Sequence, residues 1–78
     1  MINVTLPNGE VVDNYSQEYR LFCEAKWLSN KDFSFRKEWL FKIKEKRNLE
    51  LLQLEKYLNL ILSLKKVENR PVSDIIMP

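Results

Sequence analysis

Few side chains in this sequence could carry out a reaction. Cys23 is the only thiol and there is no histidine, so the commonest general base and transition-metal ligand is missing. A thiol nucleophile needs an activating base or strongly positive surroundings, whereas Cys23 falls on an apolar stripe that favours a packed core cysteine. The carboxylates lack the spacing of a calcium loop, and a single glycine leaves no phosphate-binding loop. We therefore expect a protein that is not an enzyme and has no cofactor or metal.

One group of residues has a spacing that suits binding. Lys37, Phe41 and Lys44 recur at i, i+4 and i+7, so they share one face of a helix. A phenylalanine among lysines could stack on a base while the lysines contact phosphates, or enter a partner's pocket while they contact acidic groups. Glu38 and Glu45 interrupt the basic residues and weaken the nucleic-acid interpretation. The alternative is a solvated helix whose Phe41 is covered by the tail or the hairpin.

A hairpin and three helices are expected to position these residues. "INVTL" alternates apolar and polar residues and "PNG" follows it as a turn, which predicts a β-hairpin over 2–12. Capping residues and apolar periodicity predict helices over 14–28, 34–47 and 49–68, followed by a tail over 69–78. The predicted fold class is α+β, a single domain over 1–78. Its small N-terminal β-hairpin packs on a three-helix bundle whose third helix is long and leucine-rich.

The apolar faces of the first two helices are predicted from spacing. The first helix is expected to bury a stripe that recurs every four residues, with Phe22 beside it: Tyr15, Tyr19, Cys23 and Trp27. The second is expected to turn four residues inward: Phe35, Trp39, Leu40 and Ile43. Asn48 is expected to end it in a left-handed cap.

The third helix carries more apolar surface than a small core requires. Its apolar residues cover an arc of roughly 200°, whereas a surface helix needs only about 100°. Either this helix is central and covered on several sides, or part of the arc contacts a second molecule. The second interpretation allows a homodimer through residues 49–68 and predicts three apolar contact residues: Tyr57, Leu60 and Leu64.

Composition narrows the setting. A chain of 78 residues with 45% apolar residues is one small domain, not a disordered segment. One cysteine cannot form an internal disulfide, the start "MINVTLPNGE" does not resemble a signal peptide, and no apolar run is long enough to cross a membrane. A cytoplasmic location is therefore expected. The net charge of +2 is small, but residues 31–48 are locally basic.

The N-terminal part of the chain resembles a known family. The stretch "LPNGEVVDNYSQEYRLFCEAKWL", residues 6–28, is similar to the signature of short phage and prophage proteins of unknown function. The shared residues begin with a turn and run into a helix: Leu6, Pro7, Asn8, Gly9, Val11, Val12, Asp13, Ser16, Glu18, Tyr19, Arg20, Cys23, Glu24 and Ala25. The second helix agrees in outline through Arg36, Lys37, Trp39, Leu40 and Arg47. The likeness covers about residues 4–48, and the family tends to have glycine where Asn48 stands.

The resemblance implies a short accessory gene product of phage origin, which would be located in the cytoplasm of the host cell. It brings no catalytic residues with it. Together with the excess apolar arc and the basic second helix, it predicts binding to a host or phage protein complex. Inhibition or redirection of a host complex, such as an antiviral defence complex, is the expected role. A small nucleic-acid-binding factor using the second helix, and a homo-oligomeric structural or assembly protein, are the alternatives.

Overall fold

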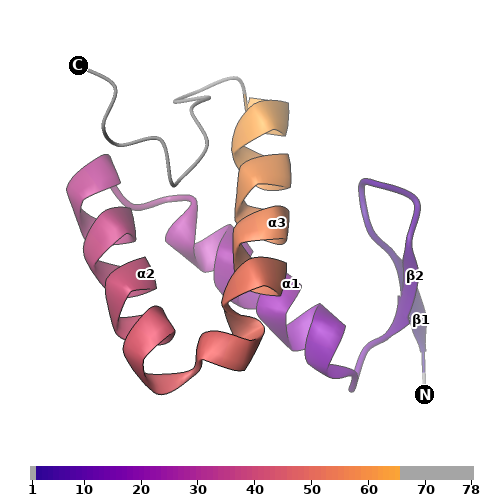
Figure 1. Cartoon of the computed structure of the whole chain (residues 1–78). Coiled ribbons are helices and arrows are strands. Elements are labelled where there is room, and N and C mark those ends of the chain that lie inside the picture. The colour runs from indigo at the N-terminus through magenta and orange to yellow at the C-terminus, as the bar shows by residue number, and fades with distance from the viewer. Residues whose placement is uncertain (1, 66–78) are drawn as a thin grey trace.

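A two-stranded antiparallel sheet leads into three α-helices in the computed structural model, which describes residues 2–65 (Figure 1). The strands are β1 (Asn3–Thr5) and β2 (Val11–Asp13), and the helices are α1 (Gln17–Leu28), α2 (Phe33–Lys46) and α3 (Asn48–Lys65). The predicted fold class is confirmed, including the long third helix. The predicted tail over 69–78 and the last residues of the predicted third helix lie outside the described residues.

The hairpin forms where the alternating pattern and the turn predict it. Val4 pairs with Val12 in the antiparallel register, and these two side chains pack on the core. The Leu6 N–H donates to the Glu10 carbonyl at 2.7 Å, which closes the loop between the strands. Gly9 has a φ of 93°, a conformation that favours glycine, so its place in the turn has a steric cause.

Side-chain caps set the starts of α1 and α2. The Ser16 hydroxyl accepts a hydrogen bond from the Tyr19 N–H at 3.1 Å, and an Asp32 carboxylate oxygen accepts one from the Phe35 N–H at 2.8 Å. Helix α1 therefore begins at Gln17 instead of residue 14, because Asn14 accepts from the Ile2 N–H. Helix α2 begins at Phe33, one residue before the predicted start.

The junction between α2 and α3 has the predicted length of one residue but lies one position earlier in the chain. Arg47 is the C-terminal cap of α2, with φ −140° and ψ 49°, and its N–H donates to the Ile43 carbonyl at 2.6 Å. The expected left-handed cap at Asn48 is wrong, because α3 already begins at this residue. Because a single residue connects α2 to α3, the two helices have little freedom to reorient. The backbone of Arg47, from which its side chain extends, is therefore held in a fixed position.

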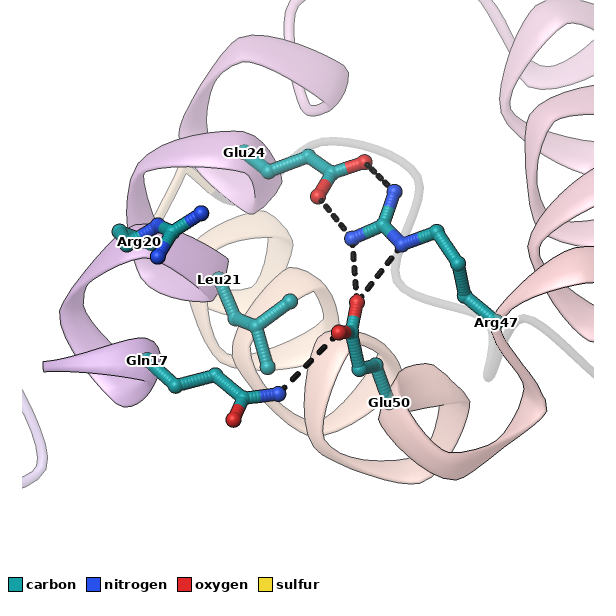
Figure 2. A pocket seen from close by; sticks show the side chains of 6 residues that line it. All are labelled: Gln17, Arg20, Leu21, Glu24, Arg47 and Glu50. Carbon is teal, nitrogen blue, oxygen red and sulfur yellow. Dashed lines mark hydrogen bonds and ion pairs between the residues drawn. The ribbon is translucent and has the colours of Figure 1, made fainter.

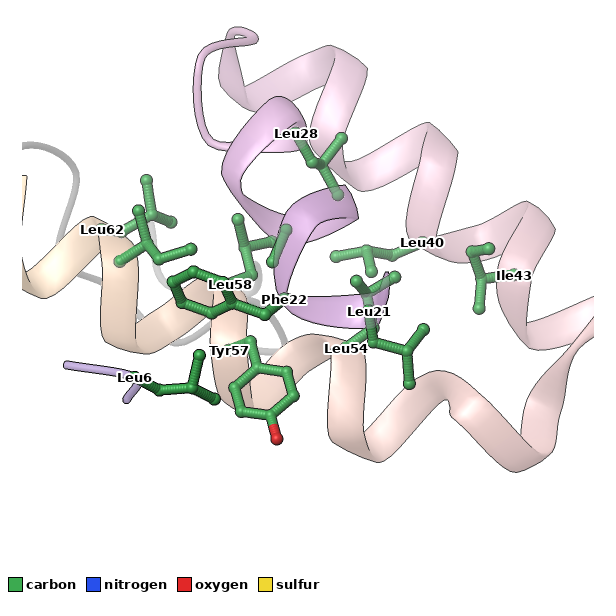
Figure 3. Packing of buried hydrophobic residues seen from close by; sticks show 12 residues of the cluster. Leu6, Leu21, Phe22, Leu28, Leu40, Ile43, Leu54, Tyr57, Leu58 and Leu62 are labelled. Carbon is green, nitrogen blue, oxygen red and sulfur yellow. The ribbon is translucent and has the colours of Figure 1, made fainter. Parts of the chain in front are cut away.

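Helix α3 is the central element, since both other helices and the hairpin contribute to the core around it (Figure 3). Tyr57 lies at the middle of this core with 0% of its surface exposed, and the Phe22 ring meets it edge-on at 5.8 Å. The buried apolar residues come from all three helices and the loop after β1: Leu6, Leu21, Phe22, Ala25, Leu28, Leu40, Ile43, Leu54, Tyr57, Leu58, Ile61 and Leu62.

The predicted buried face of the first helix is confirmed for Phe22, which is buried, and for Tyr19, which packs against the core, but it is wrong for the other three residues of the stripe. Tyr15 precedes the helix and is 75% exposed, and Cys23 and Trp27 are also exposed. A spacing of four residues advances 400° per step, so a strict four-residue stripe drifts about 40° at each step around a straight helix. Alternating steps of four and three stay on one face, and this face is the buried one: Leu21, Ala25 and Leu28.

The inward face of the second helix is predicted only in part. Leu40 and Ile43 are buried and Trp39 is half-buried, as expected, but Phe35 is exposed and Arg36 takes a buried position instead. The Arg36 guanidinium donates to the Lys31 carbonyl at 2.8 Å and lies over the Phe33 ring at 5.7 Å. Because its polar end is hydrogen-bonded and its stem is apolar, the arginine can fill a core position.

None of the three helices, over the residues that the structure describes, is long and apolar enough to cross a membrane.

Candidate functional site

Three aromatic rings meet on the surface between α1 and α2. Trp27 extends from α1, and Phe35 and Trp39 extend from the first half of α2. The Trp27 ring meets the Trp39 ring at 4.9 Å and the Phe35 ring at 5.8 Å, with interplanar angles of 69° and 80°. The Phe35 and Trp39 rings are nearly parallel at 6.0 Å. We call these three rings, together with Lys31, the aromatic surface.

The rings of the aromatic surface remain accessible. Trp27 is 41% exposed and Phe35 is 37% exposed, whereas Trp39 is half-buried and continues into the core. Single exposed apolar residues are ordinary on protein surfaces, but a contiguous group of large rings is not. Tryptophan and other aromatic residues are enriched at protein-binding surfaces because they offer large, rigid contact areas.

Lys31 adds a positive charge to this group. Its ammonium lies 5.2 Å from the centre of the Trp27 ring and 5.6 Å from the centre of the Phe35 ring. Both distances allow attraction between a cation and the face of an aromatic ring. The backbone fixes the position of Lys31, since its N–H donates to the Leu28 carbonyl at 3.0 Å and its carbonyl accepts from Arg36.

A network of hydrogen bonds holds Trp39 in place. The indole N–H of Trp39 donates to Glu24 Oε2 at 2.9 Å. The same carboxylate accepts two hydrogen bonds from Arg47, at 2.9 and 3.2 Å (Figure 2). Arg47 Nε donates to Glu50 at 2.7 Å, and Gln17 donates to Glu50 at 3.2 Å. All three helices are therefore joined through this network.

The electrostatics of the network favour charged side chains. Burial alone pushes the pKa of Glu24 up, but the hydrogen bonds from Arg47 and Trp39 outweigh it and hold this pKa below its ordinary value. The hydrogen bonds to Glu24 raise the pKa of the Arg47 guanidinium, against the effect of burial. The two groups stay oppositely charged over the whole neutral range, so their contact is a permanent ion pair.

A surface hollow of about 520 Å³ lies beside this network. Its lining residues are Gln17, Arg20, Leu21, Glu24, Arg47 and Glu50. The carboxylates that line it are bonded to Arg47, and Figure 2 shows the guanidinium between them. Because these acids already accept hydrogen bonds from the protein, the hollow presents no carboxylate free to act as a general base.

The position of Tyr57 corrects one predicted contact residue. Its hydroxyl donates to Glu10 at 3.0 Å, and Lys56 donates to the same carboxylate at 2.8 Å, so α3 is tied to the hairpin. Burial and then the hydrogen bond to Glu10 raise the pKa of Tyr57, which keeps the phenol neutral. A fully buried ring cannot contact a partner, and the expected surface role of Tyr57 is wrong.

The other predicted contact residues form no single surface. Lys37, Phe41 and Lys44 are all exposed, Phe41 by 61%, and they share a face of α2 that we call the Phe41 surface. Leu60 is half-buried and Leu64 is exposed in the last turn of α3. At 100° per residue, the Phe41 surface faces away from Phe35 and Trp39, so α2 carries two separate candidate surfaces.

At 100° per residue, the exposed Leu64 lies about 20° from the edge of the buried arc of α3, whereas Leu49 and Leu52 each lie about 80° beyond one of its edges. Leu49 and Leu52 stand in the first turns of this helix, and Leu64 stands in the last. Most of the apolar arc counted on this helix from the sequence is taken up by its five most buried residues: Leu54, Tyr57, Leu58, Ile61 and Leu62. The core of the chain itself therefore accounts for most of the leucine-rich face.

The side chains that could act as nucleophiles or metal ligands are dispersed. Cys23 is exposed on α1, which corrects the expected core position of this thiol. Within residues 2–65, no three histidine, cysteine, aspartate or glutamate side chains gather closely enough to hold a metal ion. The absence of an enzymatic activity stays a prediction.

Sequence reasoning missed the aromatic surface because it assigned these rings to the core. The spacing of Leu21, Ala25 and Leu28 predicts the buried face of α1 correctly. Around the helix axis, Trp27 lies about 100° from Leu28 and farther from the other two. Lys31 carried no such signal. Its place over two rings depends on the turn between α1 and α2, which only the folded chain defines.

No family model, no curated protein and no solved structure matches the chain. The fold and the surface define a small α+β domain with an exposed aromatic cluster. The resemblance to a family of phage proteins stays a prediction.

Proposed function

We propose that this chain is a non-catalytic protein-binding domain that contacts its partner through the aromatic surface. One observation carries the proposal: three large rings are held together at the surface by a lysine on one side and a hydrogen-bond network on the other. Binding energy at protein interfaces is concentrated in a few aromatic and arginine side chains near the centre of the contact. The resemblance at the N-terminus supports a phage accessory protein that inhibits or redirects a host complex.

Replacement of Phe35 by alanine tests this proposal. Phe35 is a large partly exposed side chain, so its loss removes contact area with little effect on the core. At the centre of an interface, such a truncation costs about 2 kcal/mol, or roughly 30-fold in Kd. The measurement is quantitative capture of proteins from a bacterial lysate, followed by titration calorimetry with the purified partner.

Phe41→Ala is the matched control, because it removes the same ring from the other face of α2. A partner retained by Phe41→Ala and lost by Phe35→Ala supports the proposal. The reverse pattern would transfer the contact to the Phe41 surface. Circular dichroism of both variants separates a lost contact from a lost fold.

Nucleic-acid binding is the second candidate function, and the exposure of the Phe41 ring near Lys37 and Lys44 favours it. An oligonucleotide bound there would lose affinity as salt rises, and each lysine removed would make that dependence less steep. No binding to single-stranded or duplex DNA at low salt would exclude this candidate. A homo-oligomeric assembly protein is the third, and a monomer in sedimentation at high concentration would exclude it.

A further inference from the structure

The aromatic surface already contains its own cation. The ammonium of Lys31 lies over the faces of Trp27 and Phe35, the position that a lysine, arginine or methylammonium group of a partner would otherwise occupy. A second cation there would meet both the repulsion of Lys31 and the loss of accessible ring face. The geometry therefore disfavours a basic partner.

Lys31 forms no ion pair with another described residue. Among residues 2–65, the ion pairs join Arg47 to Glu24 and Glu50 and join Lys56 to Glu10, and none includes Lys31. The neighbouring carboxylate of Asp32 is engaged at the start of α2, where it accepts the Phe35 N–H. Lys31 is half-buried, so part of its solvation is already lost and a carboxylate brought to it would be attracted more strongly than in open water.

More positive charge follows the same face of α2. At 100° per residue, Lys42 and Lys46 lie within about 20° of Phe35 around the helix axis. Both side chains are exposed. Glu24, the nearest acid on α1, is already paired with Arg47. Lys42 follows Trp39 by about one turn of α2 and Lys46 follows it by about two, so positive charge extends from the aromatic surface toward the end of this helix.

Single-stranded nucleic acid fits these features less well than a protein does. Bases bind to open ring faces, but Lys31 lies over the faces of Trp27 and Phe35, and the Trp27 ring meets its two neighbours edge to face. The exposed Glu38 stands beside Lys42 on α2 and would repel a continuous row of phosphates. A protein segment presents separate carboxylates, which can contact the lysines and avoid this glutamate.

We propose that the partner is an acidic protein segment in which a carboxylate pairs with Lys31 and an adjacent apolar side chain packs on Trp27 and Phe35. This inference rests on the proposed function and names the chemistry of the partner. The carboxylate sets orientation and rate of association, and the apolar side chain supplies most of the affinity.

A displayed library of random twelve-residue peptides, selected on the immobilised full-length protein, tests the inference. We expect enrichment of sequences in which aspartate or glutamate stands within a few residues of leucine, isoleucine or an aromatic residue. A selected peptide is then titrated by fluorescence anisotropy against wild type, Phe35→Ala and Lys31→Glu. Lys31→Glu should weaken binding at least about tenfold, because it turns an attraction into a repulsion.

Lys37→Glu is the matched control, since it changes the net charge by the same amount on the opposite side of α2. Thermal unfolding of each variant shows whether the fold is retained. Enriched acidic peptides that respond to Lys31→Glu and not to Lys37→Glu support the inference.

Each other outcome contradicts the inference in a recognisable way. Peptides that require Phe35 but carry no acidic residue, or that bind Lys31→Glu as tightly as wild type, overturn the acidic partner and leave the protein-binding function standing. If no selected peptide requires Phe35, the acidic partner and the proposed function both fail. An oligothymidylate that displaces the peptides and binds more tightly in a Lys31-dependent way assigns the surface to nucleic acid instead.

Discussion

Replacing Leu58 by alanine is expected to lower the free energy of unfolding by about 2–5 kcal/mol, because it removes three buried carbons and leaves a cavity. Leu58 is fully buried on the central helix and belongs to the core cluster drawn in Figure 3. A domain of this size is stable by only about 5 kcal/mol. The variant should therefore be partly unfolded at room temperature, as urea titration followed by circular dichroism at 222 nm would reveal.

Leu52→Ala is the control for this experiment. It deletes the same atoms from the same helix, but Leu52 is 80% exposed, so the change should stay within about 0.5 kcal/mol of wild type. Equal losses for the two variants would mean that the leucine-rich face of α3 is not buried as described. A large loss for Leu52→Ala alone would indicate that its end of α3 is covered by a second copy of the chain.

Replacing Glu24 by alanine is expected to have the second-largest effect. It removes the acceptor shared by Trp39 and Arg47, and so leaves a half-buried indole N–H and a guanidinium with fewer partners. The expected loss of stability is about 1–2 kcal/mol, at the low end for a buried network because 38% of the Arg47 side chain is exposed and solvent screens its charge. Urea titration gives the loss, and tryptophan fluorescence, to which Trp27 and Trp39 both contribute, reports the change in their surroundings.

The acid sensitivity of the fold provides an independent measurement of the same contact. The folded chain holds the pKa of Glu24 below its ordinary value. The stabilisation is therefore complete above the unfolded pKa of about 4.3 and is lost as the pH falls through that value toward the depressed pKa. Glu24→Gln should lose less stability than wild type between pH 6 and pH 3. Glu45→Gln, a change at an exposed residue without an ion pair among residues 2–65, should behave as wild type.

Most elements of this fold follow from local interactions that the sequence predicts. The turn at Asn8 and Gly9, the cap at Asp32 and the apolar periodicity of α3 each act over a few residues, so each predicts where its element starts within a residue or two. The start of α1 is not predicted by local sequence, because Asn14 and Ser16 can both cap a helix. The hairpin decides between them, since the Ile2 N–H donates to Asn14 and leaves Ser16 as the cap.

The aromatic surface depends on contacts between elements, and this is why the sequence did not reveal it. Trp27 could face the core or the solvent within the same helical pattern, and the choice falls to Leu21, Ala25 and Leu28 packing on α3. Tyr57 shows the opposite error: its hydroxyl suggests a surface residue, but Glu10 of the hairpin accepts its hydrogen bond and lets the ring be buried.

The hydrogen bond from Trp39 to Glu24 makes the aromatic surface rigid, which affects how selectively it can bind. Trp39 is immobilised by its indole hydrogen bond, and Trp27 packs against it at 4.9 Å, so two of the three rings have already lost their rotamer freedom on folding. Association then removes little further conformational entropy from this side of the interface. We expect rigid docking with little adaptation, in which a poorly fitting partner is rejected because the rings cannot rearrange to accept it.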